Sequence, residues 1–328
     1  MLFVHLLFNE HNRQKNIFDE IQDKRACFFF PSFVLKYRKY QTRRNIMIYL
    51  LLAILSSALI SVIMRLSTDK VQGNLSMLAV NYLTCFIIAG AFTGVGSLFV
   101  SGDALPKVLP MGVIHGVLYL VSFVLFQMNV NKNGVVLSSV FMKLGLLVPL
   151  AVSILVFGET PTALQIIGFI IAIGAIILIN AESHGTNNVS GLGLVILLLA
   201  GGVADAMSKV YEEIGPSEFS SQFLLYTFLT AFALCSVLVV VKRQPIHKNE
   251  LLFGVLIGIP NFFSAKFLLA SLDSLPAVIA YPTFSVATIL AVTMVGVAVF
   301  KEKLTTRQIV AVCAILVALV SLNIQTVN

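Results

Sequence analysis

The stretch "VFGETPTALQII" (Val156–Ile167) returns in altered form near the end of the chain, as "VFKEKLTTRQIV" (Val299–Val310). Both copies keep Val-Phe, then Glu, Thr and Gln at the same spacing. A second pair, "GVIHGVLYLVS" (Gly112–Ser122) and "GVLIGIPNFFS" (Gly254–Ser264), shares Gly-Val, a later Gly and a Ser. The same offset of 142–144 residues relates two further pairs, Tyr82 with Tyr226 and Arg65 with Lys209. Several matches at one offset indicate an internal duplication.

The composition places this duplication in a membrane. The chain has 328 residues, of which 58% are hydrophobic and 11% charged, whereas a soluble domain has about 25% charged residues. Apolar runs of about 18–25 residues, long enough to cross a bilayer as helices, recur from Met47 to the C-terminus. The sequence predicts ten spans, with approximate limits 47–65, 76–99, 110–129, 134–157, 163–180, 191–209, 220–241, 251–270, 277–300 and 307–325.

Each half of the chain therefore has five predicted spans. An odd number of spans means that the second half enters the membrane with the opposite orientation. We expect an all-α integral membrane protein of ten transmembrane helices in two inverted five-helix repeats, over residues 47–181 and 190–326. Transporters recurrently use this architecture and hold substrate near the midplane, between the repeats.

The basic residues gather in the N-terminal segment. Residues 1–46 hold nine Lys or Arg and four acids, so most of the net charge of +7 lies there. No basic groove is implied, and we expect no nucleic-acid partner. We expect residues 1–46 to be an extension outside the native chain, with the functional chain beginning at Met47. The alternative is a basic juxtamembrane tail that binds anionic lipid.

At the duplicated stretches the chain resembles the drug/metabolite transporter superfamily, EamA type, from Met47 essentially to the end. The first copy fits the family pattern at Glu159, Pro161, Gln165, Gly168 and Gly174, and Pro149 matches the proline typical of the fourth span. The second copy keeps Glu302 and Gln308 but has Leu304, Ala311 and Val317 where the pattern has Pro and two Gly, and Val292 stands opposite Pro149.

The resemblance implies a function and a layout. The family moves amino acids, nucleotide sugars, drugs and other small metabolites. Its known architecture implies that spans 1, 3, 4, 6, 8 and 9 line a central cavity, while spans 5 and 10 lie at the periphery. The apolar sequences of spans 5 and 10 agree with a peripheral position.

Lys143 is the first candidate for a substrate-binding residue. It lies about nine residues into its span, roughly 14 Å deep, near the middle of a hydrocarbon core about 30 Å thick. A charge at that depth costs at least about 2.5–3.5 kcal/mol facing lipid, so it should face protein or water. Ser139 lies one turn earlier on the same face. We expect the pair to bind a carboxylate or phosphate of the substrate; the alternative is an ion pair, with Asp205 as partner.

Asp205 is the only acid well inside a predicted span. It is the candidate for a protonatable group that couples transport to a proton gradient. The alternative is neutralisation by Lys209, four residues on and one turn away.

Further candidates for substrate binding are single polar residues in the predicted cavity spans. His115 has a pKa range that suits a proton step, although a packing role is the alternative. Tyr119 and Asn261 occupy matching positions of the two repeats. Lys266 lies close enough to the end of its span to reach the interface, and Tyr281 precedes a proline in span 9.

These features predict a secondary active transporter of a small metabolite, an amino acid, small organic acid or zwitterion, in the cell (inner or plasma) membrane. It would work by alternating access, rocking one repeat against the other, with proton coupling or exchange. A multidrug or lipid-linked sugar transporter is the alternative within the superfamily, and a membrane enzyme or non-transporting sensor the alternative outside it. We expect no enzyme activity, no cofactor and no metal, with the bilayer and a small-molecule substrate as partners, in a monomer or weak homodimer.

Overall fold

The structure is a computed structural model that describes residues 31–94, 98, 100, 104–145, 147–148, 151–152, 162–182, 191–272 and 277–322. It divides into two compact units, Met1–Asn45 and Ile46–Asn328. The expectation about residues 1–46 falls largely outside the described residues. Side chains are described from Ile48 onward, within the second unit.

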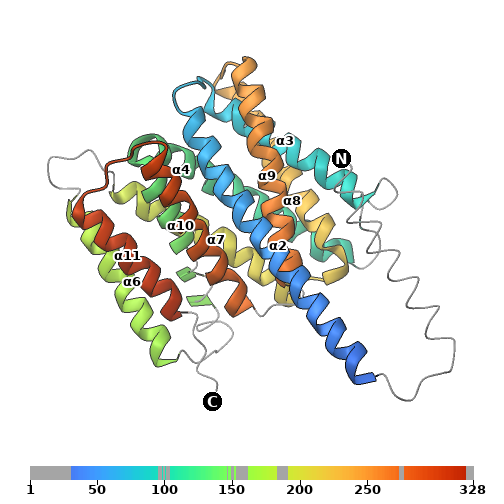
Figure 1. Ribbon diagram of the computed structural model, residues 1–328. Coiled ribbons are helices and arrows are strands. Elements are labelled where there is room, and N and C mark those ends of the chain that lie inside the picture. Colours follow the sequence, from blue (N-terminus) through green and yellow to red (C-terminus); the bar gives the residue numbers. More distant parts are fainter. Residues whose placement is uncertain are drawn as a thin grey trace. The chain divides into compact units, whose positions relative to one another are not determined.

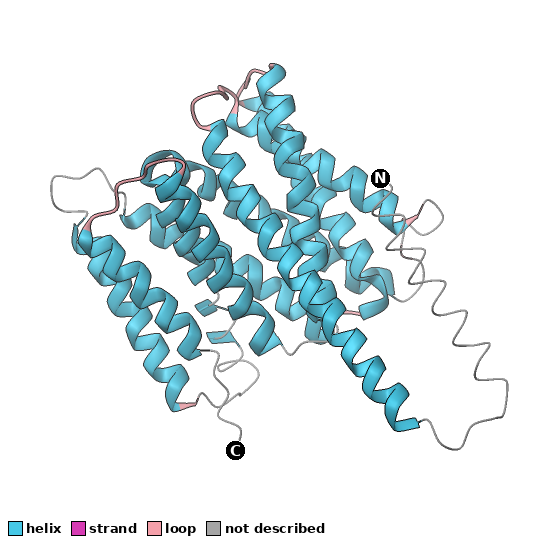
Figure 2. Ribbon diagram, in the orientation of Figure 1, coloured by secondary structure: helices cyan, strands magenta, loops and turns pink. Residues whose placement is uncertain are grey.

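All of the regular secondary structure described is helical (Figures 1 and 2). The helices are α2 (Pro31–Ser67), α3 (Asn74–Thr93), α4 (Leu105–Leu144), α6 (Ala163–Glu182), α7 (Gly191–Ile214), α8 (Ser220–Val241), α9 (Lys248–Leu272), α10 (Ala277–Ala298) and α11 (Thr306–Leu322), with a short 3-10 turn, η3 (Ser217–Phe219), before α8. A chain in lipid must satisfy its backbone hydrogen bonds within each spanning segment, which is why these apolar runs are helices.

Six of the described helical segments are long and apolar enough to cross a membrane: Ile48–Ser67, Asn74–Thr93, Leu105–Leu144, Gly191–Tyr211, Ser220–Val241 and Lys248–Ser271. Three shorter apolar helices are Ile166–Ala175, Thr283–Ala298 and Thr306–Ser321. The expectation of a multi-pass, all-helical membrane protein is therefore confirmed.

Helix α4 differs from the sequence prediction of two spans separated by a loop. It runs for 40 residues and breaks at Gly134, where φ is 80° and ψ is 168°. A straight helix of that length would be about 60 Å long, twice the hydrocarbon thickness. The break divides α4 into a first segment (105–133) and a second segment (135–144), which correspond to predicted spans 3 and 4. A positive φ is open to glycine without the steric cost that a Cβ brings.

The most extensive helix contacts join one half of the sequence to the other. Helix α3 packs against α8 and α9, α4 against α7, α8 and α10, and α6 against α11 (Figure 1). Glycines allow the helices to come close together in two of these contacts. Gly112 and Gly116 lie against α8, and Gly254 and Gly258 lie against α3. The two pairs have the same spacing, small-x-x-x-small, which brings membrane helices close together.

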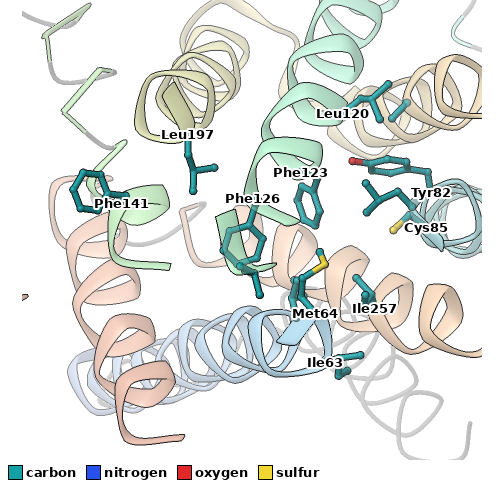
Figure 3. Packing of buried hydrophobic residues seen from close by; sticks show 14 of the residues in the cluster. Ile63, Met64, Tyr82, Cys85, Leu120, Phe123, Phe126, Phe141, Leu197 and Ile257 are labelled. Atoms are coloured by element: carbon teal, nitrogen blue, oxygen red, sulfur yellow. The ribbon is translucent and has the colours of Figure 1, made fainter. Parts of the chain in front are cut away.

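A buried apolar cluster fills the space between these helices (Figure 3). Phe123 and Phe126 of α4 pack there with Tyr82 of α3, and the rings of Tyr82 and Phe123 meet edge to face at 6.1 Å. Large apolar side chains on the opposite faces, such as Ile87 and Ile170, are exposed. That is the arrangement expected of helices whose outer faces contact lipid rather than water.

Candidate functional site

A cavity of about 140 Å³ lies between α2, α4, α7, α8, α9 and α10. Both segments of α4 contribute to it, so all six spans that the family resemblance implies for the cavity take part. Helix α8, predicted span 7, also lines the cavity through Phe223, Leu224, Thr227 and Phe228. Among the described lining residues none comes from α6 or α11, which pack against each other instead.

Six of the eight residues proposed from the sequence line this one cavity. They are His115, Tyr119, Ser139, Lys143, Asp205 and Asn261. They come from both segments of α4, from α7 and from α9, so residues up to about 150 positions apart in sequence converge on one space. These residues converge because polar groups deep in a span must face protein or water rather than lipid.

Among the described residues of the lining, Lys143 and Asp205 carry opposite charges. The Lys143 ammonium lies over the ring of Phe284, 4.0 Å from its centroid, a distance at which a cation is attracted to the ring face. The two charges attract each other, yet within the described part of the chain neither has a salt-bridge partner within 4.0 Å. Both therefore remain able to bind a ligand that enters the cavity.

Lys209 does not neutralise Asp205. Its ammonium lies 2.7 Å from Glu213, one turn further along α7. Asp205 instead presents an exposed side chain to the cavity. A helix offers Lys209 one acid on either side at the same spacing, and the sequence alone could not choose between them.

His115 bridges three helices at the cavity wall. Its Nδ1 lies 3.1 Å from the Thr227 hydroxyl of α8, and its Nε2 lies 3.0 Å from the Ser208 hydroxyl of α7. Thr227 donates its own proton to the Phe223 carbonyl at 2.8 Å, so it accepts from His115 Nδ1–H. The Nε2 atom can then accept from Ser208, which fits a neutral imidazole.

A second polar chain crosses the centre of the site. The Tyr119 hydroxyl donates to Asn261 Oδ1 at 2.6 Å, and Asn261 Nδ2 donates to Asn81 Oδ1 at 3.1 Å. Tyr119 and Asn261 are the residues that the duplicated stretches align with each other. The bond therefore joins two residues that the alignment pairs.

Tyr119→Phe is expected to destabilise the protein by about 1–3 kcal/mol, because it leaves the buried Asn261 oxygen without its donor. The measurement is the free energy of unfolding in detergent–SDS mixtures. Tyr49→Phe is the matched control, since the Tyr49 ring stacks on Phe267 and, within the described residues, its hydroxyl has no hydrogen-bond partner. Equal effects of both substitutions would contradict a specific role for the Tyr119–Asn261 bond.

Of the two remaining candidates for the cavity, only Lys266 has a described side chain. Lys266 lies outside its lining: its ammonium is 4.7 Å from the ring centroid of Phe92 and 6.0 Å from that of Phe262. The neighbouring Ala265 lines the cavity instead, because one residue further along a helix turns the side chain by about 100°. The side chain of Tyr281 lies outside the described residues.

The sequence reasoning missed several small polar residues of the lining, namely Ser57, Ser61, Ser208, Thr227 and Ser264. Ser57 and Ser61 are four residues apart and so share one helix face. Ser139 donates a hydrogen bond to Ser61 at 3.2 Å, which ties α2 to the second segment of α4. Helical spacing would have been a signal for two of them, since Ser208 lies three residues after Asp205 and Ser264 three residues after Asn261.

Comparisons with known proteins bear on the family and the fold. The model of the EamA-like transporter family matches residues 44–181 and 191–324. A protein of Haemophilus influenzae, described as uncharacterized, is 26% identical over 267 residues, which cover 78% of this chain and 90% of the relative. A crystal structure of another protein is 14% identical, with a TM-score of 0.55 over 85% of this chain and 97% of that one. At that identity the likeness shows a shared fold.

Proposed function

The chain belongs to the EamA-like transporter family, and on that premise we propose that it moves a small anionic or zwitterionic metabolite, such as an amino acid or organic acid, across the cell membrane. The observation that carries the proposal is the cavity that holds Lys143 and Asp205 without a direct salt bridge between them. An ammonium and a carboxylate in one cavity suit a ligand with the complementary charges.

We place ten spans in the membrane, in two inverted repeats over residues 47–181 and 190–326. The two family matches, one to each half, support this division. The break at Gly134 supports two crossings by α4, and the three shorter apolar helices supply further crossings.

Transport proceeds by alternating access, with Asp205 as the group that takes up and releases the coupling proton. The helix contacts favour a particular division of the moving bodies. Rocking one sequence half against the other would break the most extensive helix contacts, such as those of α3 with α8 and α9. We therefore assign α3, α8 and α9 to one body and α6, α10 and α11 to the other, with α4 joining them.

The aromatic lining favours a second candidate within the same family. Phe123, Phe126, Phe228 and Phe284 surround the polar groups, and aromatic faces attract organic cations. A cationic drug would use Asp205 and these rings and would be repelled by Lys143. The membrane enzyme and the non-transporting sensor have no such specific support.

The test is flux in proteoliposomes that contain the purified protein. Pooled labelled amino acids, organic acids and cationic dyes are offered under an imposed pH gradient and, separately, in counterflow. Uptake of an amino acid or organic acid is expected. Uptake of cationic dyes alone would favour the drug transporter, and the absence of any flux with a folded protein would favour a sensor.

A further inference from the structure

The break in α4 leaves the start of its second segment without helical acceptors. The first N–H groups of any helical segment lack a carbonyl partner within the helix. At Gly134 the backbone leaves the helical region, so the N–H groups of Val135 and Val136 are such groups. A residue far away in the sequence accepts hydrogen bonds from both N–H groups.

That residue is Glu302, in the loop between α10 and α11. Its Oε1 accepts from the Val135 N–H at 2.8 Å, and its Oε2 accepts from the Val136 N–H at 3.2 Å. A methyl group at Gly134 would lie 2.9 Å from Oε2, so the carboxylate fills the concave side of the turn. The backbone N–H of Glu302 donates to the Gly296 carbonyl at 3.1 Å, which anchors the loop to α10.

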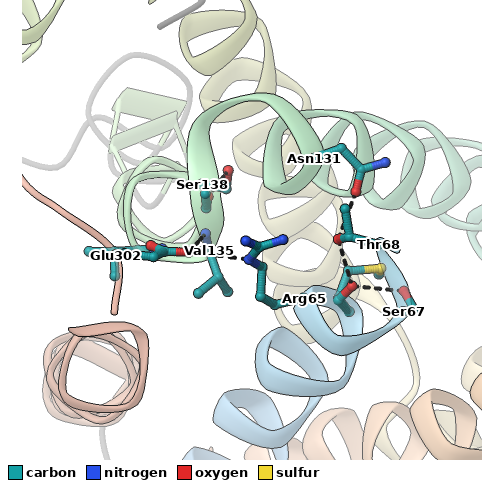
Figure 4. A network of polar contacts seen from close by, with 10 residues as sticks. Arg65, Ser67, Thr68, Asn131, Val135, Ser138 and Glu302 are labelled. Carbon is teal, nitrogen blue, oxygen red and sulfur yellow. Dashed lines mark hydrogen bonds and ion pairs between the residues drawn. The ribbon is translucent and has the colours of Figure 1, made fainter. Parts of the chain in front are cut away.

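Glu302 also contacts the end of α2 (Figure 4). The Arg65 Nε lies 3.5 Å from Glu302 Oε1, and the guanidinium lies over the Phe300 ring, 5.9 Å from its centroid. This ion pair is longer than the two backbone contacts and more exposed on the arginine side. The carboxylate is thus bound chiefly to α4, with Arg65 as a secondary partner.

The second segment of α4 carries Ser139, Met142 and Lys143 into the cavity. Its capped end lies about 12 Å from Lys143 along the helix axis, at about 1.5 Å per residue. A carboxylate also stabilises the positive end of a helix dipole. We propose that Glu302 is a positioning residue: it caps the second segment of α4 across the two halves and thereby fixes where Ser139 and Lys143 stand in the cavity.

The competing explanation is a simple ion pair between Glu302 and Arg65 that contributes nothing to α4. The two explanations differ for variants. Capping needs an acceptor oxygen at position 302 and tolerates the loss of Arg65. An ion pair needs both charges and survives their exchange.

The experiment measures labelling of a cysteine by a membrane-impermeant maleimide and needs no substrate, so it is independent of the proposed function. Met142→Cys reports on the second segment of α4, and Ala265→Cys, in α9, reports on the same cavity from another helix. Cys27 and Cys313 are changed to Ser in both reporters. Each reporter is combined with Glu302→Ala, Glu302→Gln, Arg65→Ala and the exchange Arg65→Glu with Glu302→Arg. Lys303→Ala, exposed in the same loop, is the control.

We expect Glu302→Ala to change the labelling rate at Met142→Cys by about 5- to 30-fold, the upper part of the range that loss of a helix cap gives, and to leave the rate at Ala265→Cys within about twofold. Glu302→Gln should recover part of the effect, because its amide oxygen accepts one N–H. Arg65→Ala should leave the labelling rate at Met142→Cys near that of the parent. The charge exchange should not restore the parent rate. The proposal would be overturned if Arg65→Ala changed this labelling rate as much as Glu302→Ala does, or if the charge exchange restored the parent rate.

If Glu302→Ala does not fold, Glu302→Gln against Arg65→Ala decides the question. The capping role is overturned if Arg65→Ala changes the labelling rate at Met142→Cys more than Glu302→Gln does. Equal changes at both reporters would likewise overturn it, because they indicate general loosening rather than displacement of the α4 segment.

Discussion

Lys143→Ala is expected to lower the initial rate of substrate uptake by at least about tenfold while leaving the protein folded. A hydrogen bond to a charged group contributes about 1.5–3 kcal/mol, and each 1.4 kcal/mol corresponds to a tenfold change. The measurement is uptake at subsaturating substrate in proteoliposomes. The side chain has only an aromatic ring and the attraction of Asp205 as partners in the described structure, so its loss removes a binding group without unmaking a buried salt bridge.

Lys266→Ala is the matched control for this result. Lys266 is also a lysine in a helix that lines the cavity, but its ammonium lies on Phe92 outside the lining. Its substitution should leave the uptake rate within about twofold of the parent, the level expected where no binding contact is lost. Equal losses for both variants would mean that positive charge in general, and not the cavity ammonium, supports transport.

Gly116→Val and Gly258→Val are each expected to abolish the folded state or to lower its melting temperature more than any other substitution considered. A methyl group at Gly116 would lie 2.5 Å from the Thr227 carbonyl oxygen, and one at Gly258 would lie 2.7 Å from the Asn81 carbonyl oxygen. These are backbone atoms that cannot rotate away, so α4 and α8, or α9 and α3, must separate. Overpacking typically costs about 1–3 kcal/mol, and more where the backbone is held.

Gly174→Val in α6 is the control for helix propensity. It adds the same side chain to a membrane helix, but a methyl group there meets nothing within 4 Å. Thermal unfolding in detergent, followed by fluorescence-detected size exclusion, gives the comparison. A loss at Gly174 equal to that at Gly116 would show that valine itself, and not the close helix approach, causes the effect.

The internal repeat predicts a further result of this experiment. Gly116 and Gly258 occupy matching positions of the duplicated stretches, and each lies against a carbonyl and a threonine of the other half. The two variants should therefore lose similar amounts of stability. A large difference between them would mean that the two helix crossings are not equivalent, despite their shared spacing.

Much of the fold follows from the sequence because a bilayer permits few solutions. Apolar runs in lipid must be helices, and five runs per half predict inverted repeats. The polar residues inside the runs, Lys143, Asp205 and His115 among them, must turn away from lipid, which is why so many of them converge on one cavity. Length, polarity and spacing can be read from the sequence, and the predictions of helical spans and of a polar cavity rest on them.

The rest depended on helix rotation and on contacts between distant segments. Spacing alone does not reveal that Ala265 rather than Lys266 faces the cavity, that Lys209 pairs with Glu213, or that α8 joins the lining. The cavity-facing position of Ala265 and the place of α8 in the lining are set by how each helix packs against neighbours distant in sequence. The pairing of Lys209 is a choice between two acids one turn away on its own helix. The capping of Val135 by Glu302 is the clearest case: the sequence marks both the glycine and the glutamate, but only the packing of the two halves brings a carboxylate to the N–H groups that the break leaves without acceptors.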